Sequence, residues 1–336
     1  MRKIPPIFGL IACLFYSSCQ KELTNPSPDD PPSVDTAGQF RLKTIWEYSY
    51  DAPGVFADSS RVDFTYDSIA RTLSFKSVFW DTQLNDLDSS RNTFRYNANG
   101  DWMEEEEYSA GLTSIAWTNR FTRNASGQAT QFNYTRNNGT PKNYTAFFQY
   151  QPLAGGGQRV KVIDTAYLDY SIANYYQADI DALGLVQKIE FLPWSIYDGN
   201  VIHYSYSSNG QMQKIVDSSF NAFGDGYVVV TDYVQDVTVN KVLDGFVKNC
   251  KGKNFWWYMQ DKYYNFNLFY DNYYVGTPLQ EFNVKEQQFQ GGVLVNQTEI
   301  KYTLQNTVDA NKNLIETLFL YNGILLARRK FAYQKK

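Results

Sequence analysis

The sequence predicts an all-β protein in which an antiparallel meander of repeated β-hairpins is rolled into a barrel or a strongly twisted sheet. Three observations predict it. Tyr, Phe and Trp make up 17% of the 336 residues, and aromatic residues favour pleated, half-buried surfaces. Short segments alternate apolar and polar residues with the period of a strand, as in Tyr204-Ser205-Tyr206. A Gly-centred turn motif recurs along the chain, and long stretches with helical spacing are absent.

Residues 1–18 are typical of a secretory signal peptide. The chain begins with the basic sequence MRK, residues 4–16 are mostly apolar, and Ser17 and Ser18 precede Cys19. The apolar run is too short to cross a bilayer, which takes roughly 20 residues. A buried first helix is the alternative, but the sequence PSPDDPP that follows could not join such a helix tightly to a core.

A cysteine at this cleavage position resembles the lipobox of bacterial lipoproteins. The resemblance implies that Cys19 becomes the first residue of the mature protein and carries lipid. Tyr16 and Ser18 depart from the preferred lipobox residues, in the relaxed form shown by exported Bacteroidota proteins, and Cys13 lies inside the apolar run. The sequence CQKE resembles the surface-export signal of Bacteroidota lipoproteins. We therefore expect attachment to the outer membrane through the N-terminal lipid, with the cell-surface leaflet favoured.

The rest of the chain is expected to be a tether and one domain. Residues 19–40 hold the lipidated cysteine and a flexible tether, because Pro, Asp and Ser dominate them. Residues 41–336 are expected to form a single β-repeat domain. The loop PLAGGGQ at 152–158 is the best internal boundary candidate, but copies of the turn motif lie on both sides of it.

Four segments share Asn, Asp or Ser, then a small residue, one further residue and Gly. They read RYNANGDWM, TRNASGQAT, DIDALGLVQ and SYSSNGQMQ. The side chains of Asn and Asp bond nearby backbone N–H groups and Gly adopts a positive φ, so each segment is expected to reverse a hairpin. The intervals of 27, 57 and 26 residues between their glycines indicate one missing or degenerate copy. The glycines are Gly100, Gly127, Gly184 and Gly210.

Weaker copies occur at 65–73 and 307–315, where Ala70 and Lys312 replace Gly. All the copies resemble the YD repeats of the RHS family, in which a Tyr-Asp-x-x-Gly turn recurs along β-hairpins. Together with the lipobox, the chain resembles Bacteroidota outer-membrane lipoproteins built of such hairpins. The resemblance covers most of residues 60–330 and implies architecture, not chemistry. The Tyr-Asp place holds Tyr66-Asp67, Tyr96-Asn97, Arg123-Asn124, Ile180-Asp181, Tyr206-Ser207 and Val308-Asp309.

The net charge and the cysteine content limit which binding partners and disulfide bonds are expected. The net charge of −4 becomes more negative when the basic N-terminus is removed, which argues against a nucleic-acid partner. With Cys19 lipidated, Cys250 has no partner within the mature chain, so we expect no disulfide. A nucleophilic or intermolecular role for Cys250 is less favoured than an inert thiol.

No convergent catalytic set is visible. His203 is the one histidine, and we interpret it as a polar-face strand residue. One histidine and one free cysteine exclude a standard zinc site, so neither a metal nor a cofactor is expected. The sequence DANKN at 309–313 matches half of a calcium loop but lacks the Gly that should follow, and we interpret it as a repeat turn.

The acid run Glu104 to Glu107 should split into two pairs on opposite faces of a strand, Glu104 with Glu106 and Glu105 with Glu107. The functional interpretations are a cation site or half of a glycosidase carboxylate pair. We favour a charged edge that blocks strand-to-strand aggregation.

The aromatic stretch at 254–276 is the best candidate binding site. Neighbouring aromatic residues on a strand face opposite ways, so half can fill a core while half is exposed to stack on a glycan or meet an envelope protein. The sequence therefore favours a lipid-anchored, non-catalytic binding or structural module. An envelope hydrolase or glycosidase, and a lipid or glycolipid carrier, are the alternatives. The candidate ligand residues are Trp256, Trp257, Tyr258, Tyr263 and Tyr264.

Overall fold

The structure is a computed structural model, and it describes twelve segments of the chain, which together form eighteen strands and one short 3-10 turn. The described residues are 40–52, 54–67, 72–81, 86–98, 102–109, 114–137, 142–164, 175–183, 185–191, 199–208, 212–236 and 278–335. The elements are β1 (Phe40–Ala52), β2 (Val55–Tyr66), β3 (Thr72–Asp81), β4 (Asp86–Tyr96), β5 (Trp102–Ser109), β6 (Ser114–Arg123), β7 (Ala129–Arg136), β8 (Lys142–Pro152), η1 (Ala154–Gly156), β9 (Gln158–Asp164), β10 (Tyr175–Ile180), β11 (Val186–Phe191), β12 (Gly199–Tyr206), β13 (Met212–Phe220), β14 (Gly226–Gln235), β15 (Leu279–Gln290), β16 (Val293–Val308), β17 (Leu314–Tyr321) and β18 (Ile324–Lys335).

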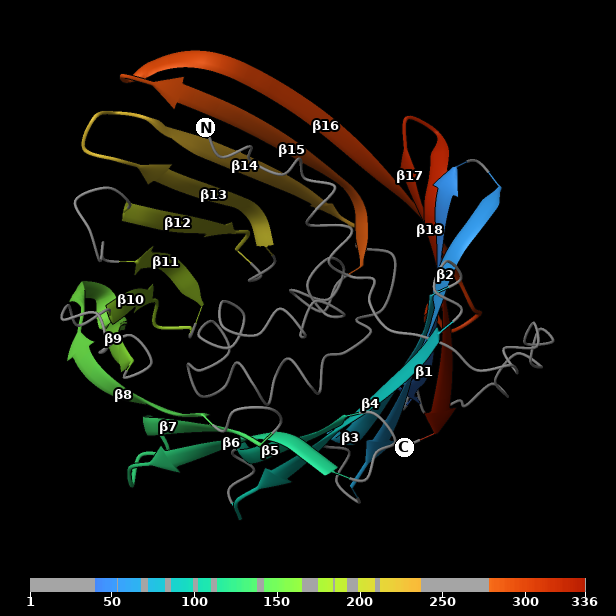
Figure 1. Cartoon of the computed structure of the whole chain (residues 1–336), viewed down its shortest axis with the longest axis horizontal. Helices are drawn as coiled ribbons and strands as arrows, with labels where there is room; N and C mark the ends of the chain where they lie inside the picture. The colour runs from blue at the N-terminus through green and yellow to red at the C-terminus, as the bar shows by residue number, and fades with distance from the viewer. Residues whose placement is uncertain are drawn as a thin grey trace.

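The strands form one closed antiparallel barrel (Figure 1). Each strand pairs with the next along the chain, and β1 also pairs with β18. The prediction of an all-β antiparallel meander is confirmed, and closure decides for the barrel over the open twisted sheet. Among the described residues, none belongs to a helix with the length and apolar character needed to cross a membrane.

The seam between β1 and β18 closes the barrel. It runs over nine residue pairs, from Phe40 opposite Lys335 to Ser49 opposite Ala327. Inside it, Arg329 donates from Nε to Oε2 of Glu47, and both side chains are almost fully buried. The pair joins residues 282 positions apart in the sequence.

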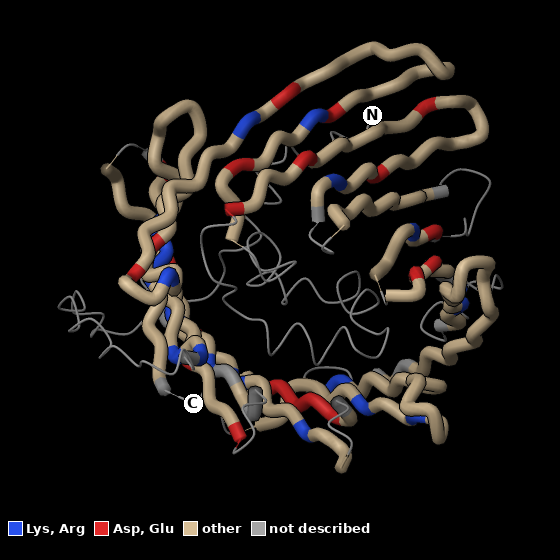
Figure 2. The backbone as a smooth tube through the Cα atoms, turned by 180° about the vertical axis from the view of Figure 1, so that it is seen from behind, with Lys and Arg blue, Asp and Glu red and all other residues tan. Residues whose placement is uncertain are grey.

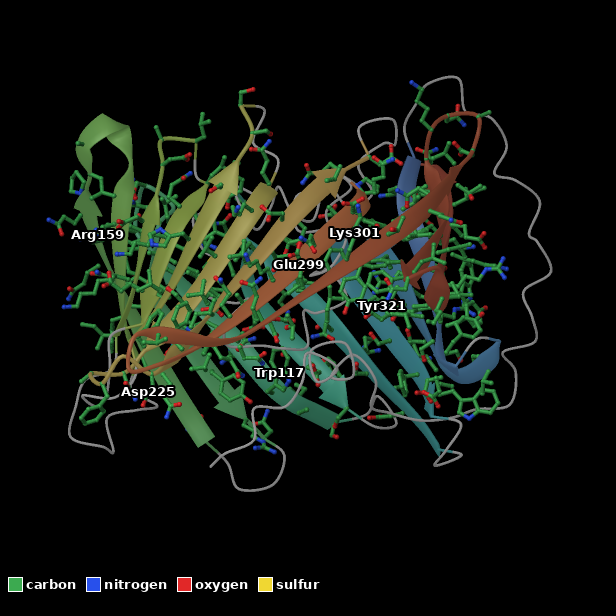
Figure 3. The ribbon with its side chains drawn as sticks, turned by 90° about the horizontal axis from the view of Figure 1, so that it is seen from above. Trp117, Arg159, Asp225, Glu299, Lys301 and Tyr321 are labelled. Carbon is green, nitrogen blue, oxygen red and sulfur yellow. The ribbon has the colours of Figure 1, made fainter. Side chains whose placement is uncertain are left out.

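The alternation of side chains becomes a division between inside and outside. Figure 3 shows Arg159 pointing away from the barrel. Residues in register on neighbouring strands share a face, so Asp179, Lys188 and His203 lie on the outer face with Arg159. The intervening residues face inward. On the same strands these inner residues are Val160, Ala178, Ile189 and Ile202.

Seven hairpins reverse at the same end of the barrel, which we call the turn rim. They join β2–β3, β4–β5, β6–β7, β8–β9, β10–β11, β12–β13 and β16–β17, each through five residues. One repeat of the motif is therefore two strands, one turn at this rim and one loop at the other. Gly127 lies in such a reversal with φ of 79°. Gly100, Gly184 and Gly210 lie outside the described residues, although the strands that flank each of them pair antiparallel.

In four of the described turns an Asx residue organises the reversal through its own backbone and side chain. The N–H of Asn124 donates to the carbonyl of Gln128 at 2.9 Å. Its Oδ1 accepts from the N–H groups of Ser126 at 3.1 Å and Gln128 at 2.9 Å. Asp181, Asn221 and Asp309 make the same three kinds of bond.

Two of these turns refine the sequence interpretation. The turn at Asn221 lies at the opposite rim, between β13 and β14, and the motif search missed it. At Asp309 the Gly position is taken by Lys312, which adopts φ of 64°. DANKN is thus a repeat turn, as predicted.

The degenerate copy of the motif is the segment Leu153–Gly157. The N–H of Leu153 donates to the carbonyl of Gly157 at 2.9 Å, and Gly156 has φ of 84°. Leu153 occupies the Asx position and offers no side-chain acceptor. The turn therefore forms here although the sequence does not match the motif. PLAGGGQ is therefore the β8–β9 hairpin turn.

An apolar layer lines the inner face near the turn rim. It contains large side chains that are almost completely buried, and Phe121 and Phe132 pack with ring centroids 5.0 Å apart. Tyrosines near the strand ends bond backbone carbonyls at the start of the neighbouring strand, as Tyr150 does to Ala129 at 2.8 Å. The layer includes Leu42, Val62, Phe64, Phe94, Phe121, Phe132, Phe148, Val160, Val162, Ile180, Ile189, Leu314 and Phe331.

Lys312→Gly should stabilise the protein by about 1 kcal/mol, because a residue with a Cβ is strained in the left-handed region and Gly is not. The urea midpoint measures this. Lys330→Gly, the same change within a paired strand, should destabilise by about 0.5–1 kcal/mol. A lower midpoint for Lys312→Gly would contradict the assignment of its turn.

Glu47→Ala should destabilise the barrel by about 3–5 kcal/mol, because it leaves the buried Arg329 charge at the seam without its carboxylate. Lys301→Ala, which removes the exposed ion pair to Glu281 (2.7 Å), should cost at most about 1 kcal/mol. Chemical denaturation of both variants measures the two changes in the free energy of unfolding. Equal decreases would show that the buried seam pair contributes no more to stability than an exposed ion pair.

Candidate functional site

Every residue singled out from the sequence as a lipid or ligand site lies outside the described residues. Cys19 is the lipidation candidate, and the five candidate ligand residues are Trp256, Trp257, Tyr258, Tyr263 and Tyr264. These assignments stay predictions. The described part of the chain instead assembles a buried polar cluster on the inner wall, where three neighbouring strands meet.

The cluster is centred on Glu105. Glu105 lies opposite Asn119 in register and beside Asn92 on the other neighbouring strand. The Nδ2 of Asn92 donates to Oε1 of Glu105 at 2.8 Å, and the Nδ2 of Asn119 donates to Oε2 at 3.1 Å. The side chains of Glu105 and Asn119 have 0% exposure. Each oxygen of the carboxyl group thus has an amide donor and no contact with water.

Burial changes the acid strength of this carboxyl group. Loss of hydration raises the pKa of Glu105 to about 8, against the lowering effect of the two amide bonds, and the charge of Glu107 adds to the rise. Burial also raises the pKa of Glu107, while hydrogen bonds with Asn92 and Trp117 lower it and the charge of Asp88 raises it. At neutral pH Glu105 therefore holds its proton.

This arrangement stores a proton within the wall. A buried neutral carboxylic acid can act as a general acid only where a substrate reaches it, and Glu105 has no exposed surface. The described residues include no group of three or more His, Cys, Asp or Glu that could hold a metal ion. The burial and hydrogen bonds of the cluster are those of a structural polar network that joins β4, β5 and β6, and they do not suit an active site.

The predicted split of the acid run onto two faces is confirmed, but its predicted role is not. Glu105 and Glu107 face inward, whereas Glu104 faces outward, where Arg95 contacts it at 2.6 Å and Arg120 forms a second ion pair. The favoured charged-edge role was wrong, because β5 pairs with β4 on one side and β6 on the other. In a closed barrel this strand has no free edge to protect.

Sequence reasoning missed the two asparagines. Asn92 and Asn119 each stand two residues before a Phe that faces the inner wall, Phe94 and Phe121. An amide at an alternating position of an otherwise apolar strand face is the signal that could have found them.

His203 lies where the sequence placed it. It is exposed on the outer face, opposite Lys188 in register. Its register partners are Lys188 and Val216, neither of which carries a hydroxyl or thiol nucleophile. The polar-face interpretation is confirmed.

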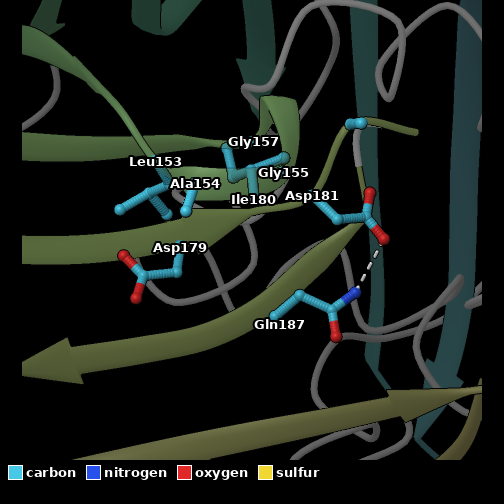
Figure 4. A pocket seen from close by; sticks show the side chains of 9 residues that line it. Leu153, Ala154, Gly155, Gly157, Asp179, Ile180, Asp181 and Gln187 are labelled. Carbon is cyan, nitrogen blue, oxygen red and sulfur yellow. Dashed lines mark hydrogen bonds between the residues drawn. The ribbon is translucent and has the colours of Figure 1, made fainter.

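A shallow pocket of ≈ 240 Å³ lies at the turn rim, between the β8–β9 turn and the β10–β11 turn (Figure 4). Its polar lining residues are Asp179, Asp181 and Gln187, and Oδ2 of Asp181 accepts from Nε2 of Gln187 at 2.9 Å. The other oxygen of Asp181 accepts the N–H groups of Leu183 and Leu185. The carboxylate of Asp181 is thus committed to its own turn, and the pocket lies where Gly155 and Gly157 carry no side chain to fill the space.

Comparisons with known proteins give only distant structural similarity. No protein-family model matches it, and no curated protein matches it. It is similar to a porin-like protein from Bacteroides uniformis (12% identity, TM-score 0.40, 88% of this chain and 96% of that chain). A porin-like protein from Bacteroides vulgatus gives 11% identity and TM-score 0.43, over 88% of this chain and 99% of that chain. The TcdB2-TccC3 structure gives 10% identity and a TM-score of 0.32, over 86% of this chain and 15% of that chain.

Glu105→Gln should change how stability depends on pH. The pKa of Glu105 is raised from 4.5 to about 8 in the folded protein, so the unfolded chain loses this proton first. The wild-type free energy of unfolding should fall relative to that of the variant by at most about 1.4 kcal/mol per pH unit between these values. Above about pH 8 the difference should stay constant.

Denaturant titrations from pH 4 to pH 9 measure the effect. Glu105→Ala is the matched control, because it leaves the Asn92 and Asn119 amides without an acceptor and should destabilise at every pH. Parallel pH profiles for the wild type and Glu105→Gln would contradict the buried neutral acid.

Proposed function

We propose that this protein is a lipid-anchored, non-catalytic binding or structural module of the bacterial outer membrane. The observation that carries the proposal is the polar outer face of the closed barrel. Lys, Arg, Asp and Glu are distributed around the wall (Figure 2). Cross-strand ion pairs lie on its outer face in many sectors: Arg95–Glu104, Arg159–Asp179, Lys214–Asp232, Lys301–Glu281 and Arg328–Glu316.

A barrel that crosses a bilayer by its strands needs an outward apolar band about 25 Å tall. A Lys or Arg on the lipid-facing side near the middle of the bilayer costs about 2–4 kcal/mol. The outer face of this barrel carries charged residues along the row Arg159, Asp179, Lys188. The outer face of the barrel is therefore better suited to contact with water than with lipid tails. We assign membrane attachment to lipid on Cys19.

The ligand half of the proposal concerns the aromatic stretch at 254–276. Its Trp and Tyr residues suit stacking on sugar rings or contact with an envelope protein. The composition of the stretch supports this assignment. The CQKE sequence after the signal peptide favours the surface-facing leaflet.

A second candidate is an envelope glycosidase that uses Glu105 and Glu107. The raised pKa of both carboxyls favours it, because a glycosidase general acid must hold its proton near neutral pH. The complete burial of Glu105 opposes it. Hydrolysis of an envelope glycan by the wild type that Glu107→Gln abolishes would reverse the order of the two candidates.

Cys19→Ser should release the protein from the membrane. The wild type should sediment with the outer membrane and need detergent for release, whereas the variant should be recovered in the soluble fraction. Fractionation with immunoblotting measures this. Cys13→Ser is the matched control and should leave the distribution unchanged. Retention of Cys19→Ser in carbonate-washed outer membranes would show that the barrel itself inserts, and the proposal would fail.

A further inference from the structure

β16 carries a long free edge at the rim opposite the turn rim. Its pairing with β15 begins at Val293, whereas its pairing with β17 begins only at Tyr302. β16 therefore continues well beyond the end of β17 (Figure 1). We call residues 293–301 the edge segment. Within the described part of the chain, it is the longest stretch of strand that pairs on one side only.

A tight turn ends β17 early and leaves this step in the closed wall. Asn322 and Gly323 connect Tyr321 to Ile324 and have φ of 49° and 77°, the left-handed values of a two-residue hairpin turn. Tyr321 lies opposite Tyr302, so the β17–β18 hairpin reverses there. On that side, the backbone N–H and C=O groups of the edge segment therefore face no strand among the described residues.

The edge segment is held in place from its other side. The N–H of Gly292 donates to the carbonyl of Gly224 at 2.9 Å, and the N–H of Gly291 donates to Oδ1 of Asp225 at 2.8 Å. A Cβ at Gly224 would lie 2.7 Å from the nitrogen of Gly292, so only glycine lets the two turns approach this closely. The β15–β16 hairpin is thus tied to the β13–β14 turn. A strand that binds the edge finds it already formed, which lowers the entropy cost of binding.

The edge segment is exposed and carries little charge. All side chains of residues 293–299 are exposed, with 65% exposure for Val293, 45% for Leu294 and 57% for Val295. Residues 293–298 include no charged residue and no Pro. Proteins commonly place Lys or Pro on an edge strand to prevent pairing with another chain. The register shift in the pairing with β15 lies beside Leu294, at the end next to the turn. The remainder of the edge is open to a further strand.

A second copy of this chain offers the partner that such an edge requires. Two free edges that pair satisfy both sets of backbone groups at once. Because an identical chain presents an edge of the same length, the two edges match without any unpaired remainder. Antiparallel pairing of two identical strands has a two-fold axis, which is the commonest symmetry of homo-oligomers.

The charges of the edge segment restrict where this axis lies. An axis at Glu299 would place that carboxylate opposite the partner's Glu299, and like charges directly opposite destabilise a sheet. Gln297 is the middle residue of the segment. An axis there places Val295 opposite the partner's Glu299 and Asn296 opposite the partner's Thr298. No like charges then meet, and the two Gln297 amides face each other, each with donors and an acceptor.

We propose that the edge segment is a dimer interface, at which it pairs antiparallel with the edge segment of a second copy about a two-fold axis at Gln297. The walls of the two barrels then continue into each other as one antiparallel sheet. Pairing of a single strand gives an interface at the small end of the known range. We therefore expect a weak dimer with a Kd of about 10–100 µM.

Opposite charges introduced at Gln297 test the axis. Sedimentation equilibrium of the Cys19→Ser protein in a density-matched detergent reports the mass of the protein alone, whether or not the barrel itself enters membranes. The unaltered edge should give a monomer–dimer equilibrium. Gln297→Lys and Gln297→Glu should each raise the Kd about 10-fold or more, because two like charges then meet at the axis. An equal mixture of the two variants should recover the dimer.

Gln287→Lys is the matched control. Gln287 lies opposite Gln297 in register, and its Nε2 donates to Oε1 of Gln297 at 3.0 Å. Both Lys substitutions therefore break the same hydrogen bond and add the same charge. Because β15 pairs on both sides, Gln287→Lys should leave the Kd nearly unchanged. A monomer at about 100 µM, equal effects of the two Lys substitutions, or a mixture that stays monomeric would overturn the proposal.

Discussion

Pairing of β1 with β18 is the constraint on which the rest of the structure depends. It removes both edges of the sheet at once and joins residues from the two ends of the domain, with Glu47 and Arg329 buried in the seam. Once the sheet is closed, the two faces of every strand become an inside and an outside. The period-two alternation then places most ion pairs on the outside and most large apolar side chains on the inside.

Antiparallel order explains why most copies of the repeat turn lie at one rim, with the turn at Asn221 at the other. In an antiparallel barrel, alternate hairpins return at the same end, so a motif with a two-strand period always falls on that end. The bonds that define the turn are made by backbone groups and one Asx side chain. The backbone bond of the turn is kept where Leu153 replaces the Asx residue, and the positive φ is kept where Lys312 replaces Gly. Such substitutions make the motif hard to recognise in the sequence.

The two faces place very different demands on their charged residues. Outside, carboxylates meet arginine and lysine in water, where ion pairs contribute little to stability. Inside, Glu105 has only amide partners, and burial favours its neutral form. Adjacent glutamates in one short run thus have different surroundings, because neighbours on a strand face opposite sides of the wall. This contrast connects the pH response of the protein to its topology.

The sequence by itself determined the class of structure: the strand alternation, the reversals around Gly127 and DANKN, the polar face at His203 and the split of the acid run. These features are local, because turn chemistry and side-chain period act over a few residues. Tertiary structure alone decided that the sheet closes, that β5 has two neighbours, and that Glu105 lies between Asn92 and Asn119. Closure depends on pairing between β1 and β18, which are distant in the chain, and the contacts of Glu105 depend on the exact register between consecutive strands. No local pattern encodes either of these.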